Sequence, residues 1–364
     1  MAGLPRGVVD ADAHIDETDA TWEYMTAEES RHKPYCFDPG EPIVPGDSRP
    51  HRFWIVDGRL GLRRWREDAR VGTTVEQREL LDVPARVRHM DELGVDVQVI
   101  YPTYFLNPQT NRPEVELALY RSYNRWLADR TAQANGRLRW VLLAPTLSMD
   151  RALEELQWGK DHGAVGIFKR AYEFGRSVAD PYWFPLYEEA QRLDLAICIH
   201  TGGDFSLNSN PLRGDIAFDR GVRTQIGCFP SLAMRQIPNR FPRLRFGVIE
   251  AMASWVPHVI ADMKAKHVYG GAMKRYSDHP MEFQEDFLRD NRFYVTCQTS
   301  DDVPYLMKFG AQDSLMIGTD YSHDDQSGVL EALSFIEELG EDGEIPMEVA
   351  KKILVDNPRA FYGL

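Results

Sequence analysis

Short apolar runs rich in β-branched residues alternate along this chain with longer amphipathic segments. Segments such as 113–133 and 148–163 repeat apolar residues at i, i+3 or i+4, which is typical of helices that bury one side. The apolar runs predict eight strands, over residues 8–15, 95–103, 138–146, 164–170, 195–202, 244–251, 293–298 and 314–320. Strands that alternate with helices favour a parallel sheet, and eight of them close a barrel, so the sequence predicts an α/β fold of the (β/α)8 TIM barrel class.

The spacing of the predicted strands shows where the barrel carries extra chain. The second strand begins at residue 95, whereas a compact strand-and-helix unit takes roughly 30 residues. The excess, residues 16–90, is rich in Pro, Gly and aromatic residues and is expected to form a lid or pocket wall over the C-terminal face of the barrel. The long connection 202–230 is expected to cover the same face. No repeat or Gly/Ser linker divides the chain, so residues 1–364 are predicted to be one domain with long loop insertions.

Composition and charge narrow the classes of partner. The 364 residues are 43% hydrophobic and 27% charged, as in soluble globular proteins. A formal net charge of −14 argues against nucleic acid, because phosphate binding needs clustered cations. No apolar run approaches the ~20 residues that cross a membrane, so no membrane partner is expected. Four widely separated cysteines without a C-x-x-C pair favour a reducing cytoplasm.

Polar residues of one chemical kind fall at the carboxyl ends of the predicted strands, where barrel active sites are built. The first strand ends in Asp12 and His14, which are two residues apart and therefore point to the same side. The fifth strand ends in His200 and the eighth in Asp320. Two imidazoles and two carboxylates that converge in this way suit Zn²⁺ or another first-row divalent ion. Each residue alone is a weak signal, and the joint placement carries the prediction.

Other strand-end residues are candidates for contact with a substrate. Lys169 and Arg170 end the fourth strand and are expected to bind a substrate carboxylate or to brace the pocket. Glu250 ends the sixth strand and could serve as a general acid or base if burial raises its pKa. Its alternatives are to bind a cationic substrate group or to pair with an arginine or backbone amides beneath the site. His323 is expected to face the substrate or brace a loop, because the turn after Asp320 should carry it away from that carboxylate. Glu17 is expected to orient a ligand from outside the site or to be a solvated loop acid.

Four segments around these residues resemble the amidohydrolase-related (amidohydrolase 2) family of the amidohydrolase superfamily. They are DADAHIDE at the first strand, AICIHTGG at the fifth, FGVIEAMASWVPHV at the sixth and IGTDYSHDD at the eighth. The resemblance covers the chain from residue 8 to residue 364. It implies one divalent metal, Zn²⁺ with Mn²⁺ as the alternative, held by Asp12, His14, His200 and Asp320. It also implies that Asp320 takes a proton from water during the reaction.

The chain departs from that family at three positions. Asp12 stands where many members have His or Glu, which keeps a ligand and adds negative charge. Glu250 stands where the decarboxylases of the family usually carry a histidine. Lys169 matches a lysine that is carboxylated in members with two metals, but the His-x-His pair that accompanies it there is absent, so one metal is expected.

Taken together, these features predict a metal-dependent hydrolase of a small organic substrate, with metal-activated water as the nucleophile. The first alternative is a non-oxidative decarboxylase (carboxy-lyase) of an aromatic or enoic acid, which the family includes and the Glu250 departure weakens. The second is a metal-free binding or scaffold barrel. The resemblance also points to a homodimer. Phosphate-loop, dinucleotide and serine-nucleophile motifs are absent from the sequence.

Overall fold

The computed structural model describes residues 6–202, 217–269 and 286–364. Its central sheet contains the eight predicted strands in the order in which they occur along the chain; one keeps its predicted bounds, 164–170, and the others are shorter than predicted. Every neighbouring pair with a defined register is parallel. The strands are β1 (Val9–His14), β5 (Val97–Tyr101), β6 (Leu138–Leu143), β7 (Ala164–Arg170), β10 (Ala196–His200), β11 (Phe246–Ile249), β12 (Phe293–Cys297) and β13 (Leu315–Ile317).

The barrel closes between its first strand and the residues that follow its last one. The amide of His14 donates to the carbonyl of Tyr321 at 3.0 Å, and the amide of Asp320 donates to the carbonyl of Asp12 at 2.8 Å. A parallel bridge joins Ala13 to Tyr321. The predicted (β/α)8 barrel is therefore confirmed, and its closing seam runs directly through three of the predicted metal ligands.

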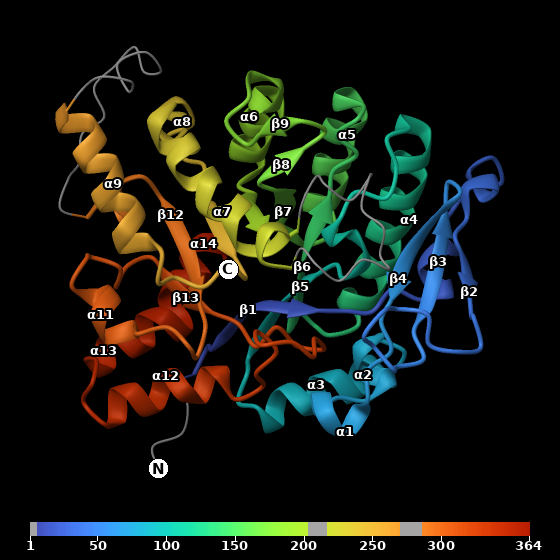
Figure 1. The fold of residues 1–364 in the computed structure, drawn as a ribbon, viewed down its shortest axis with the longest axis horizontal. Coiled ribbons are helices and arrows are strands. Elements are labelled where there is room, and N and C mark those ends of the chain that lie inside the picture. The colour runs from blue at the N-terminus through green and yellow to red at the C-terminus, as the bar shows by residue number, and fades with distance from the viewer. Residues whose placement is uncertain (1–5, 203–216, 270–285) are drawn as a thin grey trace.

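Helices surround the strands, as the alternating pattern predicts (Figure 1). No helix within the described ranges is both long and apolar enough to pass through a membrane. The longer helices are α3 (Val83–Glu92), α4 (Pro113–Ala132), α5 (Met149–Asp161), α6 (Phe184–Leu193), α7 (Ala217–Met234), α9 (Val256–Tyr269) and α12 (Ala332–Glu341). The shorter ones are α1 (Asp68–Val71), α2 (Val75–Arg78), α8 (Ile237–Arg240), α10 (Phe287–Asp290), α11 (Val303–Met307), α13 (Met347–Lys351) and α14 (Asn357–Tyr362), with a π-helical turn η7 (Lys352–Asp356) before α14.

The long insertion after β1 folds around a small antiparallel sheet, which the sequence pattern did not predict. Its strands are β2 (Tyr35–Phe37), β3 (Arg52–Val56) and β4 (Arg59–Arg63), preceded by the 3₁₀ turns η1 (Asp19–Trp22) and η2 (Glu29–His32). In Figure 1 this sheet stands to one side of the barrel, beside α4. Trp54 on its inner face packs edge-on against Trp22 at 5.6 Å and faces Tyr104, next to the end of β5, at 6.3 Å. The insertion is thereby attached to the barrel by buried aromatic rings.

The connections after β5 and β7 contain further short elements. A hairpin of β8 (Tyr172–Glu173) and β9 (Arg176–Ser177) follows β7 and leads to the turn η4 (Pro181–Trp183), while the turn η3 (Tyr104–Leu106) follows β5. The second half of the predicted connection 202–230 belongs to the helix α7, and the covering of the barrel face by this connection stays a prediction. Residues 203–216 of that connection lie outside the described residues.

The C-terminal helix α14 packs at the opposite end of the barrel from these loops. Arg359 donates to the carbonyl of Gly7, just before β1, and Arg245, just before β11, donates to the carbonyl of Phe361. The hydroxyl of Tyr362 donates to the carbonyl of Ala11 and lies 2.6 Å from the hydroxyl of Tyr101. Tyr362 thus reaches inward from the amino-terminal end of the strands, and Figure 1 shows the C-terminus near the middle of the molecule.

Glu116 on α4 is a buried carboxyl outside the strand-end cluster. One of its oxygens accepts the amide of Leu147 at 2.7 Å, which fixes the loop after β6 against α4. Burial raises the pKa of Glu116 to about 8 despite this bond, so the folded protein holds a proton there that the unfolded chain releases near its ordinary pKa of 4.5. A group of this kind lowers the stability of the fold progressively as the pH rises between the two pKa values.

Replacement of Glu116 by Gln tests this coupling. The free energy of unfolding of the wild type should fall between pH 5 and pH 8, and the fall should be smaller in Glu116→Gln because the amide does not titrate. The difference has an upper bound of about 5 kcal/mol, since one pKa unit corresponds to about 1.4 kcal/mol. Urea unfolding at several pH values measures it, and identical slopes in the two proteins would contradict the assignment.

Candidate metal centre

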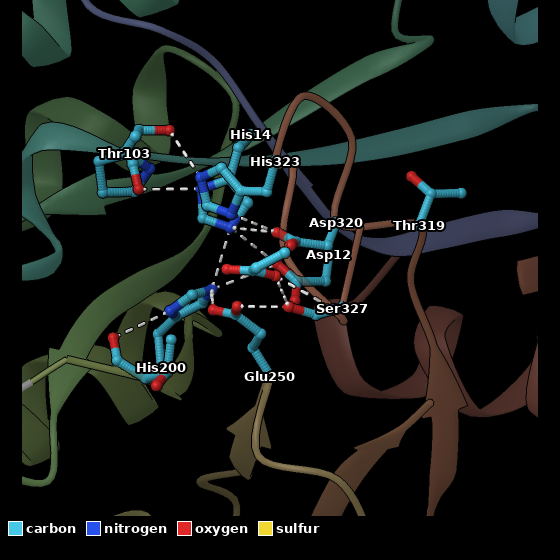
Figure 2. A network of polar contacts seen from close by, with 12 residues as sticks. Asp12, His14, Thr103, His200, Glu250, Thr319, Asp320, His323 and Ser327 are labelled. Atoms are coloured by element: carbon cyan, nitrogen blue, oxygen red, sulfur yellow. Dashed lines mark hydrogen bonds and ion pairs between the residues drawn. The ribbon is translucent and has the colours of Figure 1, made fainter. Parts of the chain in front are cut away.

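Six polar side chains from four strand ends meet at the carboxyl end of the barrel (Figure 2). They come from β1, from β10, and from the residues that follow β11 and β13: Asp12, His14, His200, Glu250, Asp320 and His323. The two histidines of β1 and β10 are fully buried, and Asp12 is 3% exposed. The four predicted metal ligands therefore lie together, as their placement in the sequence predicts.

Three of these side chains form a nearly equilateral triangle of donor atoms. The Nε2 atoms of His14 and His200 lie 3.2 Å apart. The Oδ1 atom of Asp12 lies 3.4 Å from the first nitrogen and 3.3 Å from the second. Asp320 Oδ1 lies 3.3 Å from His14 Nε2 and so adds a fourth donor beside the triangle. Donor atoms bound tetrahedrally to zinc at about 2.0–2.1 Å lie about 3.3–3.4 Å from one another, which fits these separations.

Backbone carbonyls orient both imidazoles of the triangle. His14 Nδ1 lies 3.0 Å from the carbonyl of Pro102, and His200 Nδ1 lies 3.1 Å from the carbonyl of Thr201. A carbonyl only accepts, so in each neutral ring the proton sits on Nδ1 and the lone pair of Nε2 points at its counterpart. Two such lone pairs and a carboxylate oxygen repel one another, and a cation between them removes the repulsion.

The pKa values of His14 and His200 reflect the charges that surround them. Burial and the neighbouring His323 lower the pKa of His14 to about 3, which keeps this imidazole neutral. Burial opposes charge on His200 as well, yet Asp12 and Glu250 raise its pKa above the ordinary value. A centre built from carboxyl groups and imidazoles fits a divalent ion with mixed nitrogen and oxygen ligands.

Asp320 and Glu250 reach the centre from strained backbone. Both are non-glycine residues in the left-handed region, with φ of 49° and 54°. The residue before Asp320 is fixed by Asp10, which accepts the amide of Thr319 at 2.9 Å and its hydroxyl at 2.6 Å. Conformations of this kind cost on the order of 1–3 kcal/mol and persist where surrounding contacts enforce them, commonly at functional sites.

Glu250 is held at the edge of the centre. Its Oε1 accepts the hydroxyl of Ser327 at 2.9 Å, and its Oε2 lies 3.5 Å from His200 Nε2 without a hydrogen-bond donor. Burial and the nearby charge of Asp320 raise the pKa of Glu250 well above its ordinary value. Glu250 is therefore a candidate proton donor, as its position in the sequence predicts.

His323 lies closer to Asp320 than expected. The residues after Asp320 turn sharply, with Ser322 at φ 85°, and bring His323 Nδ1 to 2.7 Å from Asp320 Oδ1. The ring stacks on that of His14 with centroids 4.0 Å apart, and its Nε2 lies 3.1 Å from the hydroxyl of Thr103. The expectation that the turn carries His323 away from Asp320 is wrong, because left-handed backbone at 320 and 322 reverses the chain.

Lys169 and Arg170 occupy a separate buried cluster. The Lys169 ammonium lies 2.6 Å from Glu173 and 3.5 Å from the centroid of the Trp183 ring. Arg170 lies 3.1 Å from the other oxygen of Glu173. The charged ends of both residues are thus engaged by the β8–β9 hairpin beside the centre, and a role in substrate binding stays a prediction.

Two polar side chains at the site, Thr103 and Ser327, are not among the predicted site residues. Thr103 ends the second predicted strand, so the rule that identified the other strand-end residues also marks it. Ser327 lies in a loop, and its contact with Glu250 has no signal in the sequence pattern.

Gly318 faces Asp12, a predicted metal ligand, across the barrel seam. A β-carbon at this position would lie 2.4 Å from Asp12 Cβ and 2.6 Å from its backbone nitrogen, so β1 would have to move. We expect Gly318→Ala to lower metal affinity at least tenfold, because a ligand displaced by a few tenths of an ångström no longer completes the set. Gly227→Ala is the control, since a β-carbon there meets nothing within 4 Å. Metal content after dialysis against micromolar ion measures the effect, and equal content in both variants would refute it.

Comparisons with known proteins agree with this architecture. A sequence model of the family described as Amidohydrolase matches residues 9–364. Amidohydrolase map2389c from Mycobacterium avium subsp. paratuberculosis K-10 is similar in structure, with a TM-score of 0.78, 17% identity and coverage of 100% of this chain and 99% of that one.

Two 5-carboxyvanillate decarboxylases are also similar. LigW from Sphingomonas paucimobilis has a TM-score of 0.64 and 15% identity, over 99% of this chain and 100% of that one. The enzyme from Novosphingobium aromaticivorans DSM 12444, solved with manganese and 4-hydroxy-3-methoxy-5-nitrobenzoic acid, has a TM-score of 0.62 and 20% identity, over 80% and 82%. At such identities these structures establish a common fold, while the family match spans almost the whole sequence. The chain belongs to the amidohydrolase family and is an enzyme, as its strand-end motifs predict.

Proposed function

We propose that this protein is a metal-dependent hydrolase of a small organic substrate. The observation that carries the proposal is the triangle of donor atoms from Asp12, His14 and His200 at the carboxyl end of the barrel. The carboxyl group of Asp320 lies beside His14, and that of Glu250 lies beside His200. Asp12, His14 and His200 would hold one divalent ion, with Asp320 as the fourth ligand beside His14. Asp320 also groups with His14, Glu250 and His323, which border the ion. We favour Zn²⁺ because the three separations within the triangle match tetrahedral zinc, and Mn²⁺ is the alternative. When bound, such an ion lowers the pKa of water and polarises a substrate oxygen.

The two strained carboxylates supply the proton transfers. Asp320, beside His323 Nδ1, is placed to accept a proton from the attacking water. Glu250 is placed to give a proton to the leaving group, because Ser327 orients the carboxyl through Oε1 and leaves Oε2 without a hydrogen-bond partner among the described residues, 3.5 Å from His200 Nε2. A base and an acid that approach the reacting bond from different strands are what hydrolysis of an amide or ester requires.

The surroundings suit a small substrate. The insertion 16–90 acts in this proposal as a lid and pocket wall. Lys169 and His323 remain substrate-binding candidates, whereas Arg170 braces the pocket through Glu173 and the carbonyls of Phe105 and Leu106. The four cysteines are free, which supports a reducing cytoplasmic location.

A carboxy-lyase is the second candidate, because two of the similar structures above are named decarboxylases. In that reaction the protonated Glu250 would deliver its proton to the carbon that loses carbon dioxide, in place of a leaving-group heteroatom. The same residues serve both reactions, so the products have to decide between them.

Metal content tests the centre itself. Wild type purified without chelator should carry about one equivalent of divalent metal per chain, and His200→Ala should carry less than a tenth of that, because the triangle loses one corner. Elemental analysis of both proteins measures it. A wild type that binds no ion even after reconstitution would favour the metal-free binding barrel.

Replacement of Glu250 by Gln tests the proton donor. The amide can still accept from Ser327, so metal content should stay at the wild-type level while turnover falls by about 100-fold or more. The assay is a screen of esters, amides and hydroxybenzoates with the metal-loaded enzyme. Unchanged turnover in Glu250→Gln would remove this residue from the mechanism.

Solvent isotopes then separate the two reactions. A hydrolase incorporates ¹⁸O from labelled water into its product, whereas a decarboxylase incorporates deuterium from D₂O at carbon and releases carbon dioxide. Label at oxygen alone would support hydrolysis, and label at carbon would establish the carboxy-lyase.

A further inference from the structure

The residues directly after β5 contact two histidines of the centre. The carbonyl of Pro102 is the partner of His14 Nδ1 at 3.0 Å, and the hydroxyl of Thr103 lies 3.1 Å from His323 Nε2. Both rings lean against each other, with centroids 4.0 Å apart. The turn formed by residues 102–106 therefore supports one side of the metal centre, and Figure 2 shows Thr103 beside the paired rings.

A buried carboxylate holds the amino end of this turn. The two oxygens of Glu17 accept the amides of Thr103 at 3.1 Å and of Tyr104 at 2.8 Å. Glu17 is 3% exposed, and these are its hydrogen bonds among the described residues. A buried carboxylate that spans two successive amides fixes the backbone to which both belong.

A buried guanidinium holds the carboxyl end of the same turn. Arg170 donates from Nε to the carbonyl of Leu106 at 2.9 Å and from a terminal nitrogen to the carbonyl of Phe105. Its remaining nitrogen is oriented by Glu173 at 3.1 Å. The turn is thus held at both ends: the Glu17 carboxyl accepts from its amides, and the Arg170 guanidinium donates to its carbonyls. Both side chains are buried.

The strand that carries His200 approaches the turn from a third direction. Gly202, two residues after that histidine, has φ of 125°, and a β-carbon there would lie 2.1 Å from the carbonyl oxygen of Leu106. Only a glycine allows this approach. The turn consequently has no room to shift towards β10.

We propose that Glu17 and Arg170 are positioning residues of the metal centre, which act by clamping residues 102–106 so that Pro102 and Thr103 set the rings of His14 and His323. The inference rests on the proposed metal site and assigns it an outer layer of contacts. Movement of this one turn would turn both rings together, and two buried polar side chains, Glu17 and Arg170, hold its five residues in place. Outer contacts of this kind typically change metal affinity by 10–100-fold.

Cobalt binding to the full-length protein tests the clamp without a substrate. Thr103→Val keeps the shape of the side chain and removes the hydroxyl, so Co²⁺ affinity should fall about tenfold and the visible absorption bands of the bound ion should change. Thr103→Ser retains the hydroxyl and should restore both. Thr131→Val, at a buried threonine on α4 whose hydroxyl bonds Leu127, is the matched control.

Replacement of Glu17 by Gln removes one of the two acceptors and turns an amide group towards a backbone N–H. We expect about tenfold weaker Co²⁺ binding with altered bands, whereas Glu155→Gln, at an equally buried glutamate on α5, should leave both unchanged. Far-UV circular dichroism checks that each variant folds. If Glu17→Gln fails to fold, Thr103→Val and Thr103→Ser still decide the test.

The outcomes separate the two proposals. Wild type that fails to bind Co²⁺ overturns the metal site and with it the clamp. Wild type that binds, together with Thr103→Val of the same affinity and spectrum, overturns the clamp and leaves the metal site standing. Weaker binding in Thr103→Val with recovery in Thr103→Ser supports the clamp.

Discussion

The organisation of this protein depends on electrostatic repulsion among lone pairs that the barrel forces together. Two buried imidazole nitrogens lie 3.2 Å apart, and a carboxylate oxygen lies within 3.4 Å of both. Such an arrangement is unfavourable unless positive charge lies between the atoms. The surrounding contacts are those needed to maintain it: carbonyls on the far side of each ring, strained backbone at Asp320 and Glu250, and a closed seam between the first strand and the last.

The residues of the centre are held in two different ways. The triangle of Asp12, His14 and His200 is buried and aligned by main-chain atoms, which suits a resident ion. Glu250 is held by a side-chain hydroxyl from a loop, so it can change its protonation state while the triangle keeps its shape. In the proposed mechanism, ion binding and proton transfer would therefore depend on different parts of the chain.

Much of the fold and of the centre can be read from the sequence. The alternation of strands and helices predicts the barrel, and the period of two along a strand places Asp12 and His14 on one side, because both signals come from local backbone geometry. The small sheet of the insertion escapes prediction, since its three- to five-residue strands lie among prolines and glycines. The position of His323 escapes it as well, because it depends on positive φ at Asp320 and Ser322, neither of which is a glycine. The contacts of Glu17 and Arg170 arise from residues far apart in the chain.

Three of the predicted metal ligands lie on the two sides of the seam that closes the barrel. Asp12 and His14 belong to the first strand of the barrel, Asp320 follows the last, and two backbone hydrogen bonds join these segments. An ion shared by them would act as a cross-link between residues more than three hundred positions apart in the chain. Because cross-links across long loops restrict the unfolded chain most, occupancy of the centre and integrity of the whole cylinder become one equilibrium, and release of the ion would first loosen the chain where its two ends meet.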